Sequence, residues 1–121
     1  MAANVLVVED DRLNRNLICK VLRNEGHQVF EACDGAEALD LLYAQRFDLV
    51  ITDFMMPKLN GIKFVERLHS LQPQIPIIFI TGFPSVISGK TILEDVAEVL
   101  AKPFGPDVLR STVHRLLDST P

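Results

Sequence analysis

Asp53 is the residue of this chain best placed to do chemistry, because it closes an apolar run, residues 47–52, of the kind that forms a buried strand. A lone carboxylate at such a place would be costly to bury. Two other groups end apolar runs in the same way and are candidates to lie near Asp53. An acidic cluster, Glu9-Asp10-Asp11, follows an earlier run, and a Lys102-Pro103 pair follows a later one. Together these residues suggest a metal-dependent phosphorylation site.

The strands that must position these residues are visible as short apolar runs. Strands are expected over residues 4–8, 27–32, 47–52, 77–80 and 96–101. The first run is too uniformly apolar for a strand with one exposed face, and it suits a buried parallel strand. The second run is less apolar, so it is expected at an edge of the sheet.

Apolar residues at helical spacing predict helices between and after the strands. The first helix ends at Gly26, an Asp34-Gly35-Ala36-Glu37 capping box starts the second, the third covers residues 61–71, and Pro106 starts the last. A fifth pattern, between Pro84 and Asp95, predicts only a short or irregular helix, because β-branched residues and a glycine weaken it. The predicted inward faces are Leu13, Leu17, Ile18, Val21 and Leu22; Ala38, Leu39 and Leu42; Ile62, Val65 and Leu68; and Val108, Leu109, Val113, Leu116 and Leu117.

Five strands that alternate with five helices predict an α/β fold with a parallel sheet covered on both faces, since each parallel connection needs a right-handed crossover. Sites in such sheets form beyond the carboxyl ends of the strands. The acidic cluster follows the first strand, Asp53 ends the third, Thr81 follows the fourth and Lys102 follows the fifth. Four polar groups at the same edge of four different strands indicate a single site.

Composition narrows the class of protein. The 121 residues suffice for a single domain, and 48% apolar with 23% charged residues is typical of a soluble globular protein. No apolar run is long enough to cross a membrane and no secretory signal is present, so we expect a cytoplasmic protein. A formal net charge of −4 and no basic run argue against direct nucleic-acid binding. Cys19 and Cys33 are expected to be reduced core residues without a role.

With its residues in this arrangement, the chain resembles the receiver domain of two-component response regulators over essentially its whole length. The similarity rests on four segments and the residues that follow them: Val7-Val8-Glu9-Asp10-Asp11; Asp53-Phe54-Met55-Met56-Pro57 with Gly61; Thr81-Gly82; and Lys102-Pro103-Phe104 with Pro106 and Leu109. The resemblance implies a flavodoxin-like, doubly wound (βα)5 fold, with a five-stranded parallel sheet in the order 2-1-3-4-5 and helices on both faces. Residues 1–121 would form one receiver domain without an output domain.

The resemblance also implies a magnesium site. Asp10 and Asp53 would ligate the metal, Glu9 would act mainly through water, and the backbone carbonyl of Met55 would supply another oxygen. Crowded carboxylates repel by roughly 4 kcal/mol per pair at about 4 Å and an effective dielectric of about 20, and a divalent cation removes this penalty. Oxygen-only ligands with room for water and phosphate favour Mg²⁺. Asp11 is left out of the ligand set as a solvated acid in the first helical turn.

By the same resemblance, Asp53 is the nucleophile that accepts a phosphoryl group from the phosphohistidine of a histidine kinase or phosphotransfer protein. Lys102 would stabilise the negative charge of transfer, and the Thr81 hydroxyl would bind the arriving phosphoryl group as a switch. Pro103 would follow a cis peptide bond that turns Lys102 into the site. The chain would be a signalling phospho-acceptor and not an enzyme with a separate substrate, although it would promote its own phosphorylation and dephosphorylation. Its phosphorylation would switch binding of a downstream protein target.

The chain departs from the common receiver pattern at three places. Val99 stands where many receivers carry the Tyr or Phe of an aromatic-rotation switch, and this chain has no aromatic ring at that position. Phe83 is bulky and apolar near the path of a hydrolytic water, where it either shields the acyl phosphate or packs at the surface. The weak helical pattern of residues 84–95 is the third departure. The combination of Thr81-Gly82-Phe83 with this weak helical pattern is similar to that of receivers fused to hybrid histidine kinases or of receivers that stand alone in phosphorelays.

Three other functions compete with phosphorylation as explanations of these residues. A haloacid dehalogenase-type phosphatase needs a second acid two residues after its nucleophile, where this chain has Met55. A flavin-binding protein of the same fold needs a phosphate-binding loop after the first strand, which is missing. A pseudo-receiver that binds partners without phosphorylation stays open as the alternative, although intact Asp10, Asp53, Thr81 and Lys102 argue against it. The sequence leaves open which kinase, which target, and whether the chain acts alone, in a relay or within a larger protein.

Overall fold

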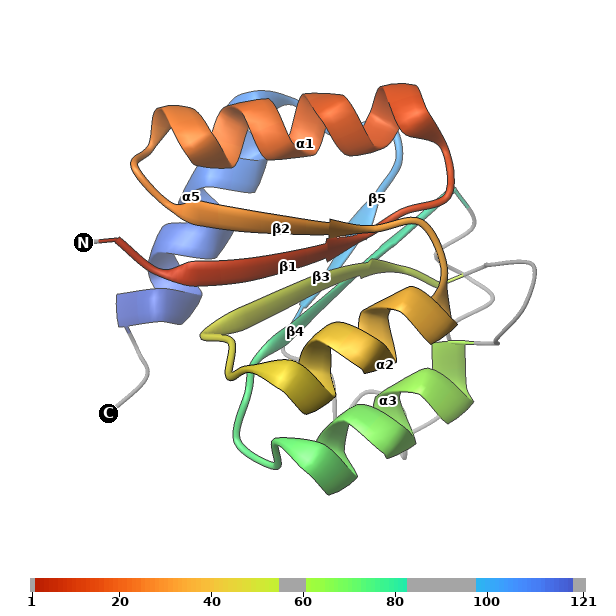
Figure 1. Ribbon diagram of the computed structural model, residues 1–121. Helices are drawn as coiled ribbons and strands as arrows, with labels where there is room; N and C mark the ends of the chain where they lie inside the picture. Colours follow the sequence, from red (N-terminus) through yellow and green to blue (C-terminus); the bar gives the residue numbers. More distant parts are fainter. Residues whose placement is uncertain (1, 55–60, 83–97, 119–121) are drawn as a thin grey trace.

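The computed structural model describes residues 2–54, 61–82 and 98–118, without the side chains of residues 61 and 62. It contains a five-stranded parallel sheet in the order β2-β1-β3-β4-β5 (Figure 1). The strands are β1 Asn4–Val8, β2 Gln28–Ala32, β3 Leu49–Asp53, β4 Ile77–Thr81 and β5 Glu98–Ala101. The predicted fold class, strand order and edge position of β2 are confirmed.

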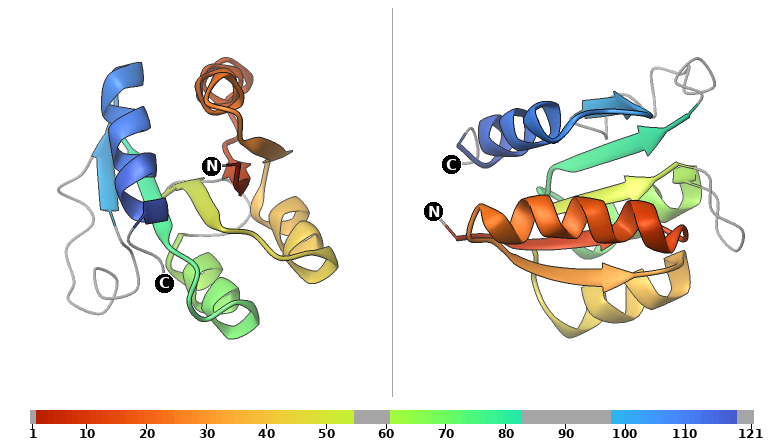
Figure 2. Two further views of the ribbon diagram at one scale, coloured as in Figure 1. Left: turned by 90° about the vertical axis from the view of Figure 1, so that its left-hand side faces the viewer. Right: turned by 90° about the horizontal axis from the view of Figure 1, so that it is seen from above.

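Four helices lie in the described part of the chain. They are α1 Arg12–Asn24, α2 Gly35–Ala44, α3 Gly61–Leu71 and α5 Pro106–Asp118. Figure 2 shows α1 and α5 on one face of the sheet and α2 and α3 on the other. The helix predicted between residues 84 and 95, and the start of the last strand at residues 96 and 97, fall outside the described residues.

Side chains of the buried strands alternate between two hydrophobic cores, as the pleat of a strand requires. Leu6 and Val8 point into the core beneath α2 and α3, whereas Val5 and Val7 point into the core beneath α1 and α5. Phe64 of α3 fills the first core with its side chain fully buried, although the sequence analysis did not assign it an inward position. Both faces of the central strands are therefore covered, and only their ends reach solvent.

The third strand begins two residues later than predicted. Phe47 is buried in the first core but precedes β3, because its N–H donates to the side-chain carbonyl of Gln72 at 3.1 Å. The amide nitrogen of Gln72 donates in turn to the backbone oxygens of Leu42 and Gln45 at 3.2 and 3.0 Å, at the end of α2. One glutamine thus fixes the turn that leads into the strand of Asp53.

Ile18 and Leu22 of α1 are buried as predicted, but the buried face of the helix is rotated away from the row of Leu13 and Leu17. Leu13 and Leu17 are 68% and 56% exposed, and the buried residues are Ile18, Cys19 and Leu22. Leu13 and Leu17 do lie four residues apart on one row, as predicted. Leu17 lies about 100° around the helix from Ile18, so the two belong to different rows. The sheet and α5 cover the row of Ile18 and Leu22, and the row of Leu13 and Leu17 faces solvent.

The last helix shows the same kind of difference at one position. Val108 is 48% exposed, which contradicts the inward position predicted for it, whereas Leu109, Val113 and Leu116 are buried as expected. Thr112 is buried beside them, because its hydroxyl donates to the backbone oxygen of Val108 at 2.8 Å and so needs no water. Thr112 was not among the residues predicted to face inward, although its helical spacing from Leu109 fits that face, because only apolar residues were assigned to it.

Substitutions on the two faces of α1 should separate sharply in their effect on stability. Leu22→Ala leaves a cavity in the core, so it should lower the free energy of unfolding by about 2–5 kcal/mol. Leu17→Ala removes an exposed side chain and should change the free energy of unfolding by less than about 0.5 kcal/mol. Urea denaturation followed by circular dichroism measures both values. Similar losses in the two variants would contradict the rotated helix face.

No helix among the residues that the structure describes is both long enough and apolar enough to cross a lipid bilayer.

Candidate functional site

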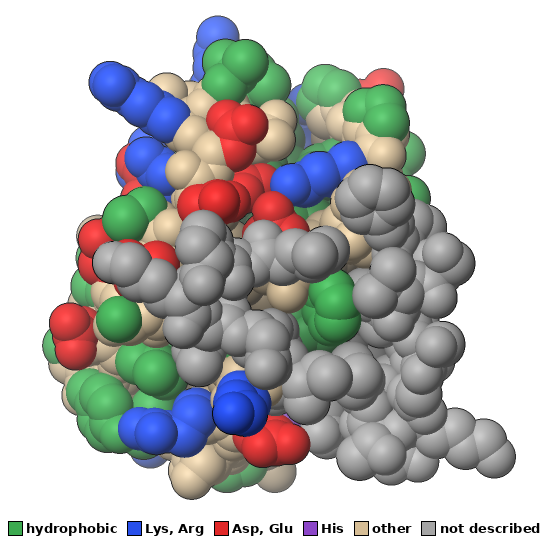
Figure 3. All heavy atoms as spheres, turned by 90° about the vertical axis from the view of Figure 1, so that its right-hand side faces the viewer, with side chains coloured by type: hydrophobic (Ala, Val, Ile, Leu, Met, Phe, Trp, Pro, Cys, Tyr) green, Lys and Arg blue, Asp and Glu red, His purple; other side chains and the backbone are tan. Residues whose placement is uncertain are grey.

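The predicted site residues gather at the carboxyl edge of the sheet. Glu9 and Asp10 follow β1, Asp53 and Thr81 are the last residues of β3 and β4, and Lys102 follows β5. Figure 3 looks at this edge and shows acidic side chains close together beside basic ones. Because parallel strands place all their carboxyl ends on one side, residues far apart in the chain meet there.

Lys102 is the centre of the contacts at this edge. Its Nζ donates to Oδ2 of Asp53 at 2.8 Å and to Oε1 of Glu9 at 2.9 Å. The side chain of Lys102 is 26% exposed, whereas those of Glu9 and Asp53 are 0% and 10% exposed. The lysine therefore supplies the positive charge that two nearly buried carboxylates require.

The backbone of Lys102 is tied to β4, while its side chain reaches Asp53 and Glu9. The N–H of Lys102 donates to the carbonyl oxygen of Thr81 at 2.7 Å. The peptide bond between Lys102 and Pro103 is cis, as the resemblance implied. Pro103 thus takes the backbone conformation expected of it.

Thr81 lies between the strands that carry the two charged residues. It is 1% exposed, pairs with Ala101 of β5, and follows Ile80, which is the register partner of Asp53. The sequence analysis placed Thr81 just after the fourth strand, whereas the structure makes it the last residue of β4. This position puts the threonine on the strand next to Asp53 and next to the residue that precedes Lys102.

The carboxylates of Glu9, Asp10 and Asp53 form a cluster that could hold a metal ion. Each offers one oxygen, and these oxygens lie within 4.8 Å of one another. Glu9 and Asp53 are buried, while Asp10 is exposed at the mouth of the cluster. Three oxygen donors, one of them open to water, fit the needs of Mg²⁺. The fourth ligand predicted, the carbonyl of Met55, lies outside the described residues.

The close packing of these groups shifts the pKa values of Glu9 and Lys102. Burial raises the pKa of Glu9 to about 7; the hydrogen bond from Lys102 opposes this rise, and the neighbouring Asp53 adds to it. Burial lowers the pKa of Lys102, but the hydrogen bonds to Asp53 and Glu9 outweigh that effect and raise it. The lysine therefore stays protonated at neutral pH. Its positive charge is a permanent part of the site.

Asp11 has a different role from the other two acids of its segment. Its Oδ1 accepts from the N–H groups of Leu13 and Asn14 at 2.9 and 3.3 Å, which makes it the N-cap of α1. The N–H of Asp11 donates to Oε2 of Glu9 at 3.3 Å. Asp11 thus starts the helix and helps to orient Glu9, in agreement with its exclusion from the predicted ligand set.

Of the residues predicted to modulate the site, Val99 is described and Phe83 lies outside the described residues. Val99 is half-buried on β5 and packs against the core that contains Phe54 and Phe79. The rings of Phe54 and Phe79 meet edge to face with their centroids 5.2 Å apart. An apolar side chain therefore stands where many receivers carry a switch aromatic.

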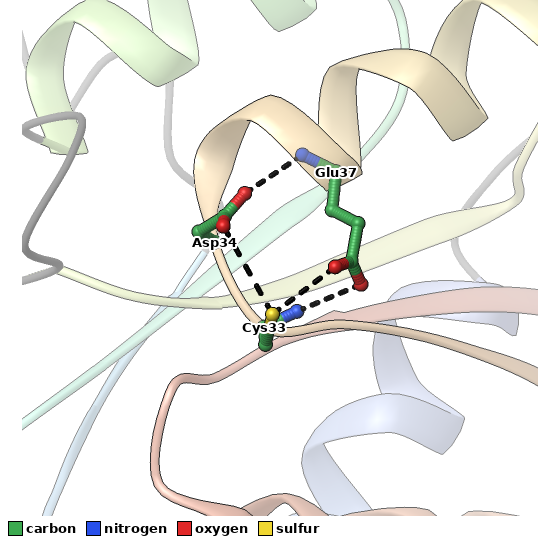
Figure 4. A group of neighbouring side chains, drawn as sticks. All are labelled: Cys33, Asp34 and Glu37. Carbon is green, nitrogen blue, oxygen red and sulfur yellow. Dashed lines mark hydrogen bonds between the residues drawn. The ribbon is translucent and has the colours of Figure 1, made fainter.

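A second group of possible metal ligands lies at the start of α2 and consists of Cys33, Asp34 and Glu37 (Figure 4). Helix capping accounts for its carboxylates: Asp34 accepts from the N–H of Glu37 at 2.8 Å, and Glu37 accepts from the N–H of Cys33 at 3.2 Å. The return bond thus comes from one residue earlier than in the predicted capping box. The Cys33 thiol also donates to Glu37, at 3.1 Å.

The expectation that Cys33 is a core residue is wrong. Its side chain is only half-buried, and its thiol donates to the carboxylates of Asp34 and Glu37. Those carboxylates, the hydrogen bond to Glu37 first, raise the pKa of the thiol. Cys19, by contrast, is buried and unpaired as predicted, and burial raises the pKa of its thiol to about 11. Neither thiol is poised to react.

Fold and site together define a receiver domain. The sequence model of the "Response regulator receiver domain" family matches residues 5–114, and the chain belongs to this family. It is therefore a receiver domain of the kind that response regulators use in two-component signalling.

Curated relatives and solved structures agree with this assignment. Response regulator MprA of Mycolicibacterium vanbaalenii is 37% identical, over 99% of this chain and 52% of its own length. The receiver protein CpdR of Brucella abortus is 33% identical over 93% of this chain and 95% of its length. The chain thus spans about half of MprA and nearly all of CpdR.

Two solved structures show the same fold along nearly all of their length. Response regulator TrrA of Thermotoga maritima, in complex with Mg²⁺-BeF, has a TM-score of 0.85 at 29% identity and matches 93% of this chain and 97% of its own. The chemotaxis protein CheY4 of Vibrio cholerae has a TM-score of 0.83 at 30% identity, over 96% and 99% of the two chains.

Proposed function

We propose that Asp53 accepts a phosphoryl group from a phosphohistidine in a Mg²⁺-dependent transfer, and that phosphorylation changes which partner proteins this chain binds. The observation that carries the proposal is the contact of Lys102 Nζ with Asp53 Oδ2 at 2.8 Å inside a cluster of three carboxylates. A buried acid paired with a cation, next to possible metal ligands, supports a role in phosphoryl transfer over a purely stabilising one.

The chemistry follows from the groups present. A carboxylate oxygen of Asp53 attacks phosphorus, the new O–P bond forms as the N–P bond of phosphohistidine breaks, and the imidazole leaves. Negative charge spreads over the three equatorial oxygens during the transfer. The ammonium group of Lys102 is bonded to the Asp53 carboxylate, so it lies close to where the oxygens of the incoming phosphoryl group would be. Thr81, on the next strand, would donate its hydroxyl to the phosphoryl group afterwards.

Asp10 and Asp53 would hold the magnesium ion directly, and Glu9 would hold it through water. When bound, the ion would neutralise the carboxylates and the charge of the phosphoryl oxygens. The fit rests on the three oxygens within 4.8 Å of one another. The complex of the related TrrA with Mg²⁺-BeF supports the same choice of metal.

The partners follow from this chemistry. The donor would be a histidine kinase or a histidine phosphotransfer protein, and the recipient of the signal a downstream protein. The chain itself would act as a phospho-acceptor that promotes its own phosphorylation and dephosphorylation, and not as an enzyme with a separate substrate. A net charge of −4 gives no support to direct contact with nucleic acid.

Acetyl phosphate tests the proposal without knowledge of the kinase. The protein incubated with acetyl phosphate and MgCl₂ should gain the mass of one phosphoryl group, because the small donor needs only the metal, Lys102 and Asp53. Excess EDTA should prevent the gain, and intact-protein mass spectrometry measures both. A protein that gains no mass with magnesium, or gains as much with EDTA, would contradict the proposal. The first of these results would favour the pseudo-receiver alternative.

A further inference from the structure

Arg15 of α1 reaches the acidic segment from the side opposite to Lys102. Its Nη1 donates to the backbone oxygen of Glu9 at 2.8 Å, and its Nε donates to Oε1 of Glu31, on β2, at 3.2 Å. The side chain is 17% exposed. An arginine held this closely, with two fixed partners, is part of the framework of the site and not a solvated surface charge.

The carbonyl that Arg15 holds belongs to the peptide unit between Glu9 and Asp10. The N–H of Glu9 donates to the backbone oxygen of Ala32 at 3.0 Å, so β2 fixes the other side of the residue. The two peptide units that flank the Cα of Glu9 are thus each held by a hydrogen bond, the first to β2 and the second to Arg15. Because the Cα of Asp10 is part of that planar unit, the direction in which the Asp10 carboxylate leaves the backbone depends on the Arg15 bond.

A second arginine on the same helix provides a comparison. Arg23 donates from Nη2 to Oε2 of Glu31 at 3.3 Å and to the backbone oxygen of Val29 at 3.0 Å. It therefore shares Glu31 with Arg15 and also ties α1 to β2. Its backbone partner, however, lies near the start of β2 and not in the acidic segment. The two arginines differ in the one contact that matters for Asp10.

We propose that Arg15 is a positioning residue for the metal site: its hydrogen bond to the Glu9 carbonyl orients the peptide that carries Asp10, and so sets the affinity for Mg²⁺. The inference rests on the proposed magnesium site. Groups that hold a metal ligand in place without touching the metal commonly change affinity by about 10- to 100-fold when removed. Glu31 positions Arg15 in turn.

The sign of the effect separates positioning from simple electrostatics. Loss of a positive charge near a cation site should strengthen the binding of Mg²⁺ by Coulomb's law. Loss of the hydrogen bond that Arg15 makes to the peptide before Asp10 should weaken the binding of Mg²⁺. Arg15→Met removes the charge and this hydrogen bond together with little change in side-chain length, so a weaker affinity in this variant can come only from lost positioning.

The experiment is a calorimetric titration of MgCl₂ into the unphosphorylated wild type, Arg15→Met and Arg23→Met. Arg15→Met should bind about tenfold more weakly, and Arg23→Met within about twofold of the wild type. With acetyl phosphate, Arg15→Met should need about tenfold more Mg²⁺ for half-maximal labelling of Asp53, yet reach a rate within about twofold of the wild type at saturation. A merely structural defect would lower the saturated rate and affect both variants.

The possible outcomes decide separately between this inference and the proposed function. Arg15→Met that binds Mg²⁺ as tightly as the wild type, or Arg23→Met that loses as much affinity as Arg15→Met, overturns the positioning role. A wild type that binds no Mg²⁺ overturns the proposed function before any variant is compared. Circular dichroism checks the fold. If Arg15→Met does not fold, Arg15→Gln takes its place with the same expectation, because its neutral side chain is too short to bridge Glu9 and Glu31.

Discussion

Asp53→Asn should abolish phosphorylation completely, both by acetyl phosphate and by a phosphohistidine donor. The amide nitrogen is not a nucleophile, and the other acids of the cluster are held otherwise: Glu9 lies against Lys102 and the N–H of Asp11. Asparagine keeps the shape of aspartate and an oxygen that can accept from Lys102, so the fold should survive. The adduct is measured by intact-protein mass spectrometry at saturating Mg²⁺.

Asp11→Asn is the matched control for this prediction. It removes the same charge from an acid of the same segment, but Asp11 caps α1 and asparagine caps a helix equally well. Labelling of this variant should stay within about twofold of the wild type, since an exposed charge contributes little. A phosphorylated Asp53→Asn protein, or loss of labelling in both variants, would show that another residue is the acceptor or that the charge of the segment is what matters.

The meeting of these residues could be predicted because strand ends are visible in the sequence. Apolar runs stop at Val8, at Thr52 and at Ala101, and a polar residue follows each stop. A parallel sheet then gathers the carboxyl ends on one side. The distances themselves came only from the structure: Lys102 is 49 residues from Asp53 and 93 from Glu9, and no local pattern reports a contact between them.

Which face of each helix is buried was harder to predict than where the helix begins and ends. Residues 61–71 and the start at Pro106 were predicted as observed, because glycine, proline and caps are local signals. Leu13, Leu17 and Val108 were predicted inside and lie outside. The 3.6-residue period fixes which residues share a face, but the sheet and the neighbouring helix decide which face is covered. On α1, where several apolar rows compete, the sequence alone cannot choose.

Arg15 was missed for a different reason. Its key partner is a backbone oxygen, and such a bond leaves no residue-type signature. In the sequence Arg15 looks like Arg12 or Arg23 on the same helix. Its position four residues after the cap Asp11 was the one available signal, because it places the side chain one turn above the acidic segment. Contacts from side chains to backbone are therefore where a structure adds most to a motif.

Lys102→Met should slow the phosphorylation of Asp53 by about 10²- to 10³-fold at saturating Mg²⁺, which is the usual cost of removing one group that stabilises a charged transition state. Methionine keeps the length and the apolar stem of the lysine but brings no charge to the equatorial oxygens. Because Asp53 stays in place, labelling should be slow and not absent. The initial rate of mass gain with acetyl phosphate measures the effect.

The slow rate must come from lost charge stabilisation and not from lost metal, and the structure predicts that the two separate. Lys102 competes with a cation for Glu9 and Asp53, since its ammonium group sits on both carboxylates at 2.9 and 2.8 Å. Its removal should therefore leave Mg²⁺ affinity unchanged or raise it, as calorimetry would show. Lys20→Met, at an exposed position of α1, removes the same charge away from the site and should label like the wild type. Lys102→Met that labels at the wild-type rate would mean that its ion pairs only balance the buried acids.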